Sequence, residues 1–304
     1  MAIAATVFIG VLTAVQARIN GALGAAIGDG FVAASISFGT GLVLILVITL
    51  SAPSGRRGLR LLVAGAGRGI PIWMLLGGLA GAVTVATQGL TVATIGVALF
   101  TVGLVAGQTA GGLVLDRVGY GPAGVVAVTV PRLVGGLLAI VGVVLCALGQ
   151  RGEPVAWWML ALPLIAGAGI AWQQGTNGRL RQELGSPLST TVVNFTGGSI
   201  ALGIAAAVSV TVNGMPSALP AEPWMYLGGA MGVVYIVISA ALVKRTGVLL
   251  LGLGSVVGLL AASIVLDAIA PPPSGPSLLA ATTAAAVAFV GVVIAVVPWR
   301  RRVR

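Results

Sequence analysis

The chain has 304 residues, of which 58% are hydrophobic and 7% are charged, and its formal net charge is +10. Soluble domains carry about 25% charged residues, so this composition excludes a soluble globular protein and predicts an all-α integral membrane protein. The positive charges lie in short loops and at the C-terminal end rather than on one basic face. We therefore expect the lipid bilayer, and no nucleic acid, as a partner.

Ten apolar segments are long enough to cross a bilayer as α-helices, since about 20 residues span its hydrocarbon core. The first begins near the N-terminus without an early Lys or Arg, so we expect a membrane helix there rather than a cleaved signal. Turn residues separate several segments, namely SAPSG at 51–55, GYGP at 119–122, GSP at 185–187 and PPPSGP at 271–276. The predicted spans are 2–23, 31–51, 71–91, 94–115, 121–148, 156–176, 188–212, 223–243, 247–269 and 276–298.

Lys and Arg residues divide unequally between the two sides that ten spans define. With the N-terminus inside, 13 of the 16 basic residues fall inside, Arg18 and Arg151 fall outside, and Arg132 lies within the fifth span. The excess of positive charge inside predicts that both termini are cytoplasmic. Because the chain is rich in Ala, Val and Gly, we expect a GC-rich bacterial source and a location in the bacterial inner (cytoplasmic) membrane.

The sequence repeats itself. WQQGTNGRL at 172–180 resembles VQARINGAL at 15–23, and residues 15–41 align without gaps on 172–198 with 7 of 27 identities. Residues 73–116 align on 224–267 with 18 of 44 identities. We therefore expect two five-helix repeats, 1–152 and 153–304, and because five is odd the second is inverted in the membrane. Inverted repeats are typical of secondary transporters that bind substrate near the midplane between the halves.

The repeated Q-x-x-x-N-G-x-L pattern and the five-plus-five arrangement resemble the drug/metabolite transporter (DMT) superfamily, EamA-like, in its YdcZ-like branch. The resemblance covers essentially the whole chain and looks like a fused pair of five-helix units. It implies a bundle with pseudo-twofold symmetry and alternating access. Many small relatives carry a membrane-embedded Glu for cation/proton exchange, whereas this chain has no carboxylate in the middle of its first span.

Amide side chains recur in the first and sixth spans. Thr13, Gln16 and Asn20 share one helical face, and Gln173 and Asn177 repeat that face. Amides are costly in a bilayer unless they are paired. Two interpretations stay open: the amides line a central cavity and bind substrate, or they bond across helices and hold the two halves together.

Four charged residues are also candidates. Arg18, in the outer third of the first span, is either a contact for an anionic substrate or a side chain that snorkels to the outer interface. Asp116 and Asp267 are equivalent residues near the ends of the fourth and ninth spans, where they are either interfacial and paired, or act as gates or as a proton site. Arg132 is expected to pair with Asp116 as a gate or structural salt bridge.

Other polar and aromatic residues complete the candidate substrate site, and Thr84 and Tyr235 occupy equivalent places in the two repeats. Small residues at four-residue spacing, Gly103, Gly107 and Gly111 and again Gly254 and Gly258, are interpreted as surfaces where helices approach closely. The additional site candidates are Thr84, Gln88, Trp172, Asn194 and Tyr235.

Several kinds of chemistry have no residues to support them. Histidine is absent and Cys146 is the only cysteine, so we expect no metal site and no disulfide within the chain. No G-x-x-x-x-G-K-[ST] motif exists, so we expect no cofactor and no ATP-driven pumping by this chain alone.

The function expected from the sequence is secondary transport of a small polar metabolite by alternating access, with proton or substrate counter-transport as its energy source. A non-transporting membrane scaffold or a channel is the alternative. An intramembrane enzyme is least supported, because Asp116 and Asp267 would lie on opposite sides of the membrane and GxGD is absent. A homodimer stays open.

Overall fold

The structure is a computed structural model that describes residues 2–65, 69–121, 124–152, 154–216 and 218–296, with the backbone alone described at residues 2–3, 239–252 and 296. These described residues form helices joined by short loops and contain no β-strand. The elements are α1 (Ala2–Ile27), α2 (Gly30–Ser51), α3 (Pro53–Gly65), α4 (Ile72–Leu75), α5 (Gly78–Arg117), α6 (Val130–Leu148), α7 (Trp157–Leu184), α8 (Pro187–Asn213), the 3₁₀ helix η1 (Pro223–Tyr226), α9 (Gly228–Ile269) and α10 (Leu278–Val296).

Six helical stretches among the described residues are long and apolar enough to cross a membrane. Two shorter apolar stretches, Gly228–Ile238 and Leu253–Ile269, both belong to α9. The prediction of an all-α membrane protein is confirmed, while the number of ten spans stays a prediction. The six stretches are Ala4–Ile27, Gly30–Ser51, Ile72–Arg117, Val130–Leu148, Pro187–Asn213 and Leu278–Ala295.

Several predicted boundaries were wrong. The third and fourth spans join in one 40-residue helix, α5, which is interrupted only at Gly96, where φ is 85° and ψ is 165°. The fifth span begins at Val130 instead of residue 121, because Gly119 and Gly124 adopt positive φ angles in the preceding segment. The sixth span continues to Leu184 as α7.

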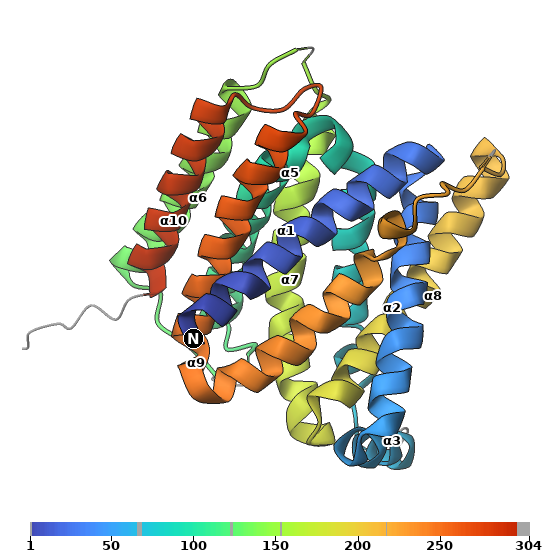
Figure 1. Cartoon of the computed structure of the whole chain (residues 1–304). Helices are drawn as coiled ribbons and strands as arrows, with labels where there is room; N and C mark the ends of the chain where they lie inside the picture. The colour runs from blue at the N-terminus through green and yellow to red at the C-terminus, as the bar shows by residue number, and fades with distance from the viewer. Residues whose placement is uncertain (1, 66–68, 122–123, 153, 217, 297–304) are drawn as a thin grey trace, which may run out of the picture.

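The loop expected after the second span contains the amphipathic helix α3. Its Arg56, Arg57 and Arg60 are exposed, and its Gly55 and Gly58 are buried against the ends of α2 and α8. α3 lies at the lower end of the molecule in Figure 1, at the same end as the start of α1. A short basic helix of this kind suits the boundary between lipid headgroups and water.

The helices pack in crossed pairs that join the first part of the chain to the second. α1 lies along α9, α7 along α5, α6 along α10 and α2 along α8 (Figure 1). A Cβ on Gly258 would lie 1.9 Å from the Val7 carbonyl oxygen, and a Cβ on Gly107 would lie 2.0 Å from that of Leu164. These glycines therefore let backbones touch, which confirms that the small-residue rows are packing surfaces.

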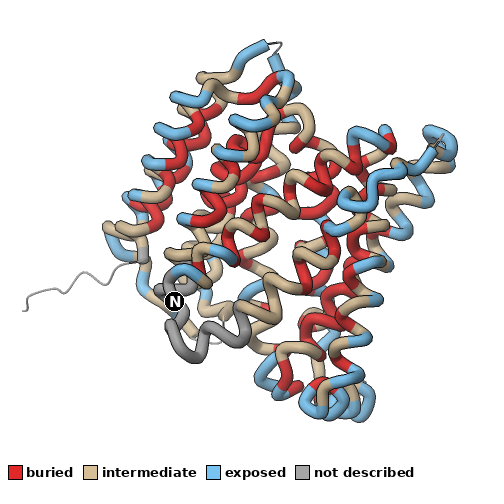
Figure 2. The backbone as a smooth tube through the Cα atoms, viewed as in Figure 1, coloured by how far each residue is buried: buried red, intermediate tan, exposed pale blue. Residues whose placement is uncertain are grey.

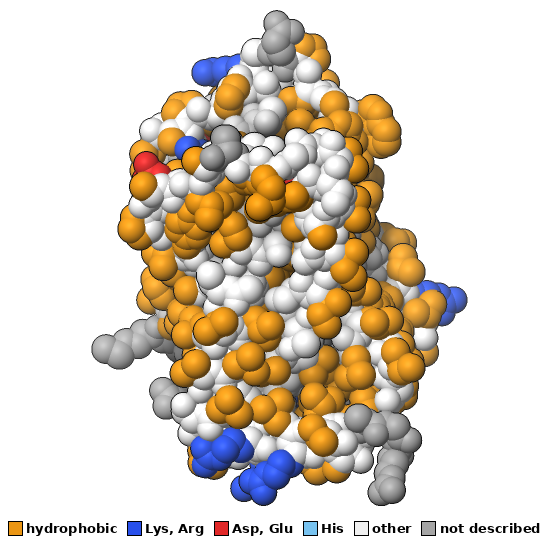
Figure 3. Space-filling model, turned by 90° about the vertical axis from the view of Figure 1, so that its right-hand side faces the viewer, with side chains coloured by type: hydrophobic (Ala, Val, Ile, Leu, Met, Phe, Trp, Pro, Cys, Tyr) orange, Lys and Arg blue, Asp and Glu red, His pale blue; other side chains and the backbone are white. Residues whose placement is uncertain are grey.

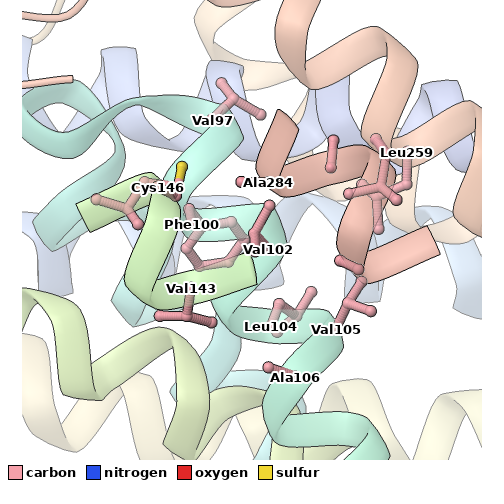
Figure 4. Close-up of a cluster of buried hydrophobic side chains, with 14 of the residues drawn as sticks. Val97, Phe100, Val102, Leu104, Val105, Ala106, Val143, Cys146, Leu259 and Ala284 are labelled. Carbon is pink, nitrogen blue, oxygen red and sulfur yellow. The ribbon is translucent and has the colours of Figure 1, made fainter. Parts of the chain in front are cut away.

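The largest buried cluster lies where α5, α6, α9 and α10 meet. Phe100 and Cys146 are 1% and 0% exposed, and they pack with Val143 and Ala284 (Figure 4). Buried residues follow the inward faces of the helices, and exposed residues lie outside and at the helix ends (Figure 2).

The outward faces are apolar, as contact with lipid requires. On α8, Ile200, Ile204, Val208 and Val212 form an exposed stripe at four-residue spacing, each more than half exposed. On the face that Figure 3 shows, hydrophobic side chains are widespread, and Lys or Arg side chains lie toward the ends and edges, with two groups at the lower end. A water-soluble monomer rarely exposes so much contiguous apolar surface, whereas hydrocarbon solvates it without cost.

Candidate functional site

Gln16 of α1 and Gln173 of α7 lie against glycines of the helices that they cross. The Gln16 Nε2 atom lies 3.0 Å from the point where a Cβ on Gly232 of α9 would be, and the Gln173 Nε2 atom lies 3.1 Å from the equivalent point on Gly81 of α5. Both glutamines are half-buried. Neither makes a side-chain hydrogen bond to any residue that the structure describes, so both keep free donors and acceptors.

Asn20 of α1 is fully buried and bonded to another amide. Its Nδ2 donates to Oε1 of Gln88 on α5 at 2.6 Å, and Gln88 is 2% exposed. Its Oδ1 atom lies 2.1 Å from the point where a Cβ on Gly228 would be. That oxygen and the Ser37 hydroxyl have no hydrogen-bond partner in the described part of the chain. Asn20 and Gln88 therefore connect α1 to α5 inside the protein.

Asn177 of α7 is paired in a different way. Its Oδ1 accepts a 2.8 Å hydrogen bond from Nδ2 of Asn194 on α8, and the same Nδ2 donates to the Thr190 carbonyl oxygen at 3.1 Å. Both Asn Oδ1 atoms lie 2.8 Å from the position of a Cβ on Gly77. The second amide pair therefore holds α7 to α8 and leaves no room for a side chain at residue 77.

The structure thus separates the predicted amides into two groups. Asn20 pairs with Gln88 and Asn177 pairs with Asn194 at helix contacts, whereas Gln16 and Gln173 bond to none of the described residues. Of the other candidates, Thr84 is buried and its hydroxyl donates to the Ala80 carbonyl of its own helix. Trp172 and Tyr235 are half-buried on α7 and α9.

Asp116 and Arg132 form the predicted ion pair. The Arg132 guanidinium bonds to the Asp116 carboxylate, and the two side chains are 25% and 34% exposed. The Asp116 carbonyl oxygen also accepts hydrogen bonds from the N–H groups of Gly119 and Val126. The pair therefore fixes the segment between α5 and α6, and its action as a gate stays a prediction.

Asp267 has a role that the sequence did not predict. Its Oδ1 accepts from the N–H of Val97 at 2.9 Å and its Oδ2 from the N–H of Ala98 at 2.7 Å. These two N–H groups open the second part of α5, directly after the break at Gly96. A Cβ on Gly96 would lie 2.6 Å from Asp267 Oδ2. The carboxylate at the end of α9 therefore caps a helix that begins in the middle of α5.

A cluster around Tyr120 was also missed. The Tyr120 hydroxyl is 2.9 Å from the Thr176 hydroxyl, and the Arg179 Nε donates to the Tyr120 carbonyl at 2.7 Å. The Arg179 guanidinium carbon lies 5.7 Å from the centre of the Trp73 ring and 5.8 Å from that of Tyr120. Residues that are far apart in the sequence therefore form one polar and aromatic cluster that joins α7 to the segment after α5.

A cavity of about 250 Å³ lies beside Arg18. Its walls come from the second half of α1, from α5 just before the Gly96 break, and from the proline segment after α9. The lining residues are Arg18, Ala22, Ala25, Val92, Ala93, Pro271, Pro272 and Pro273. Among the candidates for substrate contact, Arg18 lies at this cavity and Gln16 and Gln173 lie at the helix crossings.

Comparison with models of known protein families assigns the chain to one family. The family model DMT_YdcZ, described as "Putative inner membrane exporter, YdcZ", matches residues 1–145 and 158–297. No curated protein matches the chain. The matched residues cover nearly the whole sequence, and the family description agrees with the apolar helices and with a role in membrane transport. The chain therefore belongs to the YdcZ inner membrane exporter family of the DMT superfamily.

Proposed function

We propose that the protein is a secondary transporter that exports a small polar metabolite by alternating access between two inverted halves, residues 1–152 and 153–304. Ten membrane spans make up these halves, with the break at Gly96 separating the third from the fourth. Both termini lie in the cytoplasm of a bacterial cell. The family description supports export, and the distribution of Lys and Arg supports the orientation.

Matching contacts in the two halves support the inverted repeat. Gln16 rests on Gly232, and the equivalent Gln173 rests on Gly81, which is the sequence counterpart of Gly232. Phe38 and Phe195 are also equivalent, and their ring centroids are 5.1 Å apart. The glutamine–glycine contact therefore occurs twice, once from each half, and the two phenylalanines meet as equivalent residues. A twofold relation between inverted repeats requires contacts of both kinds.

The free glutamines carry the proposal for the substrate path. Gln16 and Gln173 lie where α1 crosses α9 and α7 crosses α5, and each holds an amide that no described residue satisfies. Because an unpaired amide is costly within a bilayer, a polar substrate passing between the halves is the natural partner for it. Trp172 and Tyr235 lie on the same helices and add aromatic walls to this path.

Movement between the halves follows from the same packing. At Gly107 and Gly258 the crossing helices approach each other backbone to backbone, and we infer that they rock about these contacts while Asn20 and Gln88 hold α1 to α5. A proton or a second substrate molecule supplies the driving force. The carboxylates that could carry a proton are Asp116 and Asp267, each fixed at a helix end.

Thermal stabilisation of the purified protein by a metabolite library tests this function, because a ligand that binds the folded state raises its melting temperature. A hit is then tested with Gln16→Ala and Gln173→Ala. The matched control is Gln174→Ala, since Gln174 is the neighbouring amide on α7 and is exposed. We expect the hit to stop raising the melting temperature of Gln16→Ala and Gln173→Ala, and to stabilise the Gln174→Ala control as it does the parent.

Transport of the hit in proteoliposomes completes the test. Saturable, counterflow-dependent uptake that falls at least tenfold in Gln16→Ala and Gln173→Ala supports the proposal. A flux that does not saturate identifies a channel, and a protein that binds no metabolite and moves none is a scaffold. Either result contradicts alternating access.

A further inference from the structure

Arg18 is a half-buried cation that makes no direct polar contact with any side chain or carbonyl in the described part of the chain. Its guanidinium makes no hydrogen bond and no ion pair with the residues that the structure describes, and it faces the cavity of about 250 Å³ between α1, α5 and the proline segment. Asp267 interacts electrostatically with Arg18. Both Asp267 oxygens, however, are already bonded to the N–H groups of Val97 and Ala98. An intramembrane arginine without a direct hydrogen-bonded partner is costly, and a ligand can offset that cost.

The equivalent place in the other half is filled. The alignment pairs Arg18 with Gly175, and a constant offset of 151 residues pairs Pro271 with Tyr120. A Cβ on Gly175 would lie 3.0 Å from Cδ1 of Tyr120, so the tyrosine ring closes the gap between α7 and the segment after α5. In the first half, Pro271 stands in place of Tyr120 and leaves the cavity open. Arg18 stands in place of Gly175 and brings a guanidinium to this cavity. The two ends therefore differ in both volume and charge.

We propose that the Arg18 cavity binds the carboxylate of a small organic anion, and that a compound of this class is the substrate. This inference rests on the proposed function for the claim that the ligand is transported. Arg presents two parallel N–H donors that match a carboxylate. Ala22, Val92 and Pro272 provide apolar walls for a short hydrocarbon stem. The volume is slightly below the range of about 300–1,000 Å³ for drug-sized ligands, which restricts the site to anions of a few carbons.

Isothermal titration of the purified full chain in nanodiscs of neutral phosphatidylcholine tests the binding. The probes are sodium butyrate, sodium succinate and the uncharged isostere butyramide. We expect a carboxylate to bind, butyramide not to bind, and Arg18→Gln to weaken the carboxylate at least tenfold. Arg151→Gln is the matched control, because Arg151 is an exposed arginine on the same predicted side of the membrane. The affinity of this variant for the carboxylate should stay within twofold of the parent value.

A second variant keeps the charge and removes the space. Ala22→Phe adds an aromatic ring to the cavity wall, in imitation of Tyr120, and should abolish carboxylate binding while the protein keeps its melting temperature and its elution volume. Equal carboxylate affinity in the parent, Arg18→Gln and Ala22→Phe overturns the proposal. So does the absence of carboxylate binding to the parent.

An anionic lipid headgroup would offer the same chemistry, so the titration is repeated in nanodiscs containing phosphatidylglycerol. Unchanged carboxylate affinity supports the proposal, whereas loss of carboxylate binding in these nanodiscs identifies a lipid site and overturns it. Transport separates this inference from the proposed function. If Arg18→Gln transports a library hit at the parent rate, the anion inference fails and the transporter stands. If carboxylate binds at Arg18 but no compound is transported, the proposed function fails.

Discussion

Replacing Asp267 should destabilise the protein through the break in α5. The Asp267 carboxylate accepts hydrogen bonds from the N–H groups of Val97 and Ala98. These two residues are 0% and 1% exposed, so water cannot replace the carboxylate as their acceptor. An N-cap replaced by Ala costs about 0.5–2 kcal/mol, and a buried donor left unpaired costs about 1–3 kcal/mol. Because Asp267→Ala leaves two such donors, we expect a loss of about 2–4 kcal/mol in the free energy of unfolding. Asp267→Asn keeps one acceptor and should lose about 1 kcal/mol.

The assay is unfolding of the purified protein in mixed micelles with increasing sodium dodecyl sulfate, followed by circular dichroism. Asp116→Ala is the matched control, since Asp116 is the sequence counterpart of Asp267 but pairs with the partly exposed Arg132. A pair of that kind contributes about 0–1 kcal/mol. If Asp267→Ala and Asp116→Ala cost the same, the cap does not stabilise the break and the reasoning is refuted.

Three further changes test other contacts. Gly258→Leu places a side chain against the α1 backbone and should prevent folding or lower the free energy of unfolding by several kcal/mol. Gly203→Leu is the control, because no atom lies within 4 Å of a Cβ at that position, and it should leave the melting temperature nearly unchanged. Equal effects of the two changes would contradict close packing of α1 on α9. Tyr120→Ala removes the aromatic ring between α7 and the segment after α5, and it should change the transport rate more than it changes binding in the titration. Tyr120→Phe keeps the ring and should restore the transport rate. Loss of binding in Tyr120→Ala without a change in transport rate would contradict a role of Tyr120 in closure. Arg132→Gln should lower stability by less than about 1 kcal/mol at low salt and by nothing at high salt, because a partly exposed ion pair is screened by salt. A loss that persists at high salt would contradict this account of the pair.

Much of the fold could be predicted because the bilayer imposes it. Apolar runs of about 20 residues must become helices when no water satisfies the backbone, and the small-residue rows had to lie at close contacts. The boundaries were less predictable where tertiary contacts decide them. The join between the third and fourth spans depends on Gly96, and the helix that restarts there is capped by Asp267, which lies 170 residues after Val97.

The site was predictable in kind but not in detail. Duplication identified Gln16 and Gln173, yet nothing local distinguishes these free amides from the paired Asn20 and Asn177. That distinction depends on which glycine or amide faces each residue across the helix contact. The cluster of Tyr120 and Arg179 was missed because an aromatic loop residue and a basic residue at a helix end resemble ordinary interfacial side chains in the sequence.

The inverted arrangement is the central claim, and accessibility of single cysteines tests it most directly. In a Cys146→Ala background, Ser54→Cys is introduced in α3 and Glu222→Cys before η1, at two exposed positions in corresponding loops of the two halves. A membrane-impermeant maleimide added outside intact spheroplasts should label Glu222→Cys and should reach Ser54→Cys only after the membrane is opened. Labelling of both cysteines from the same side would contradict inversion and, with it, alternating access between inverted halves.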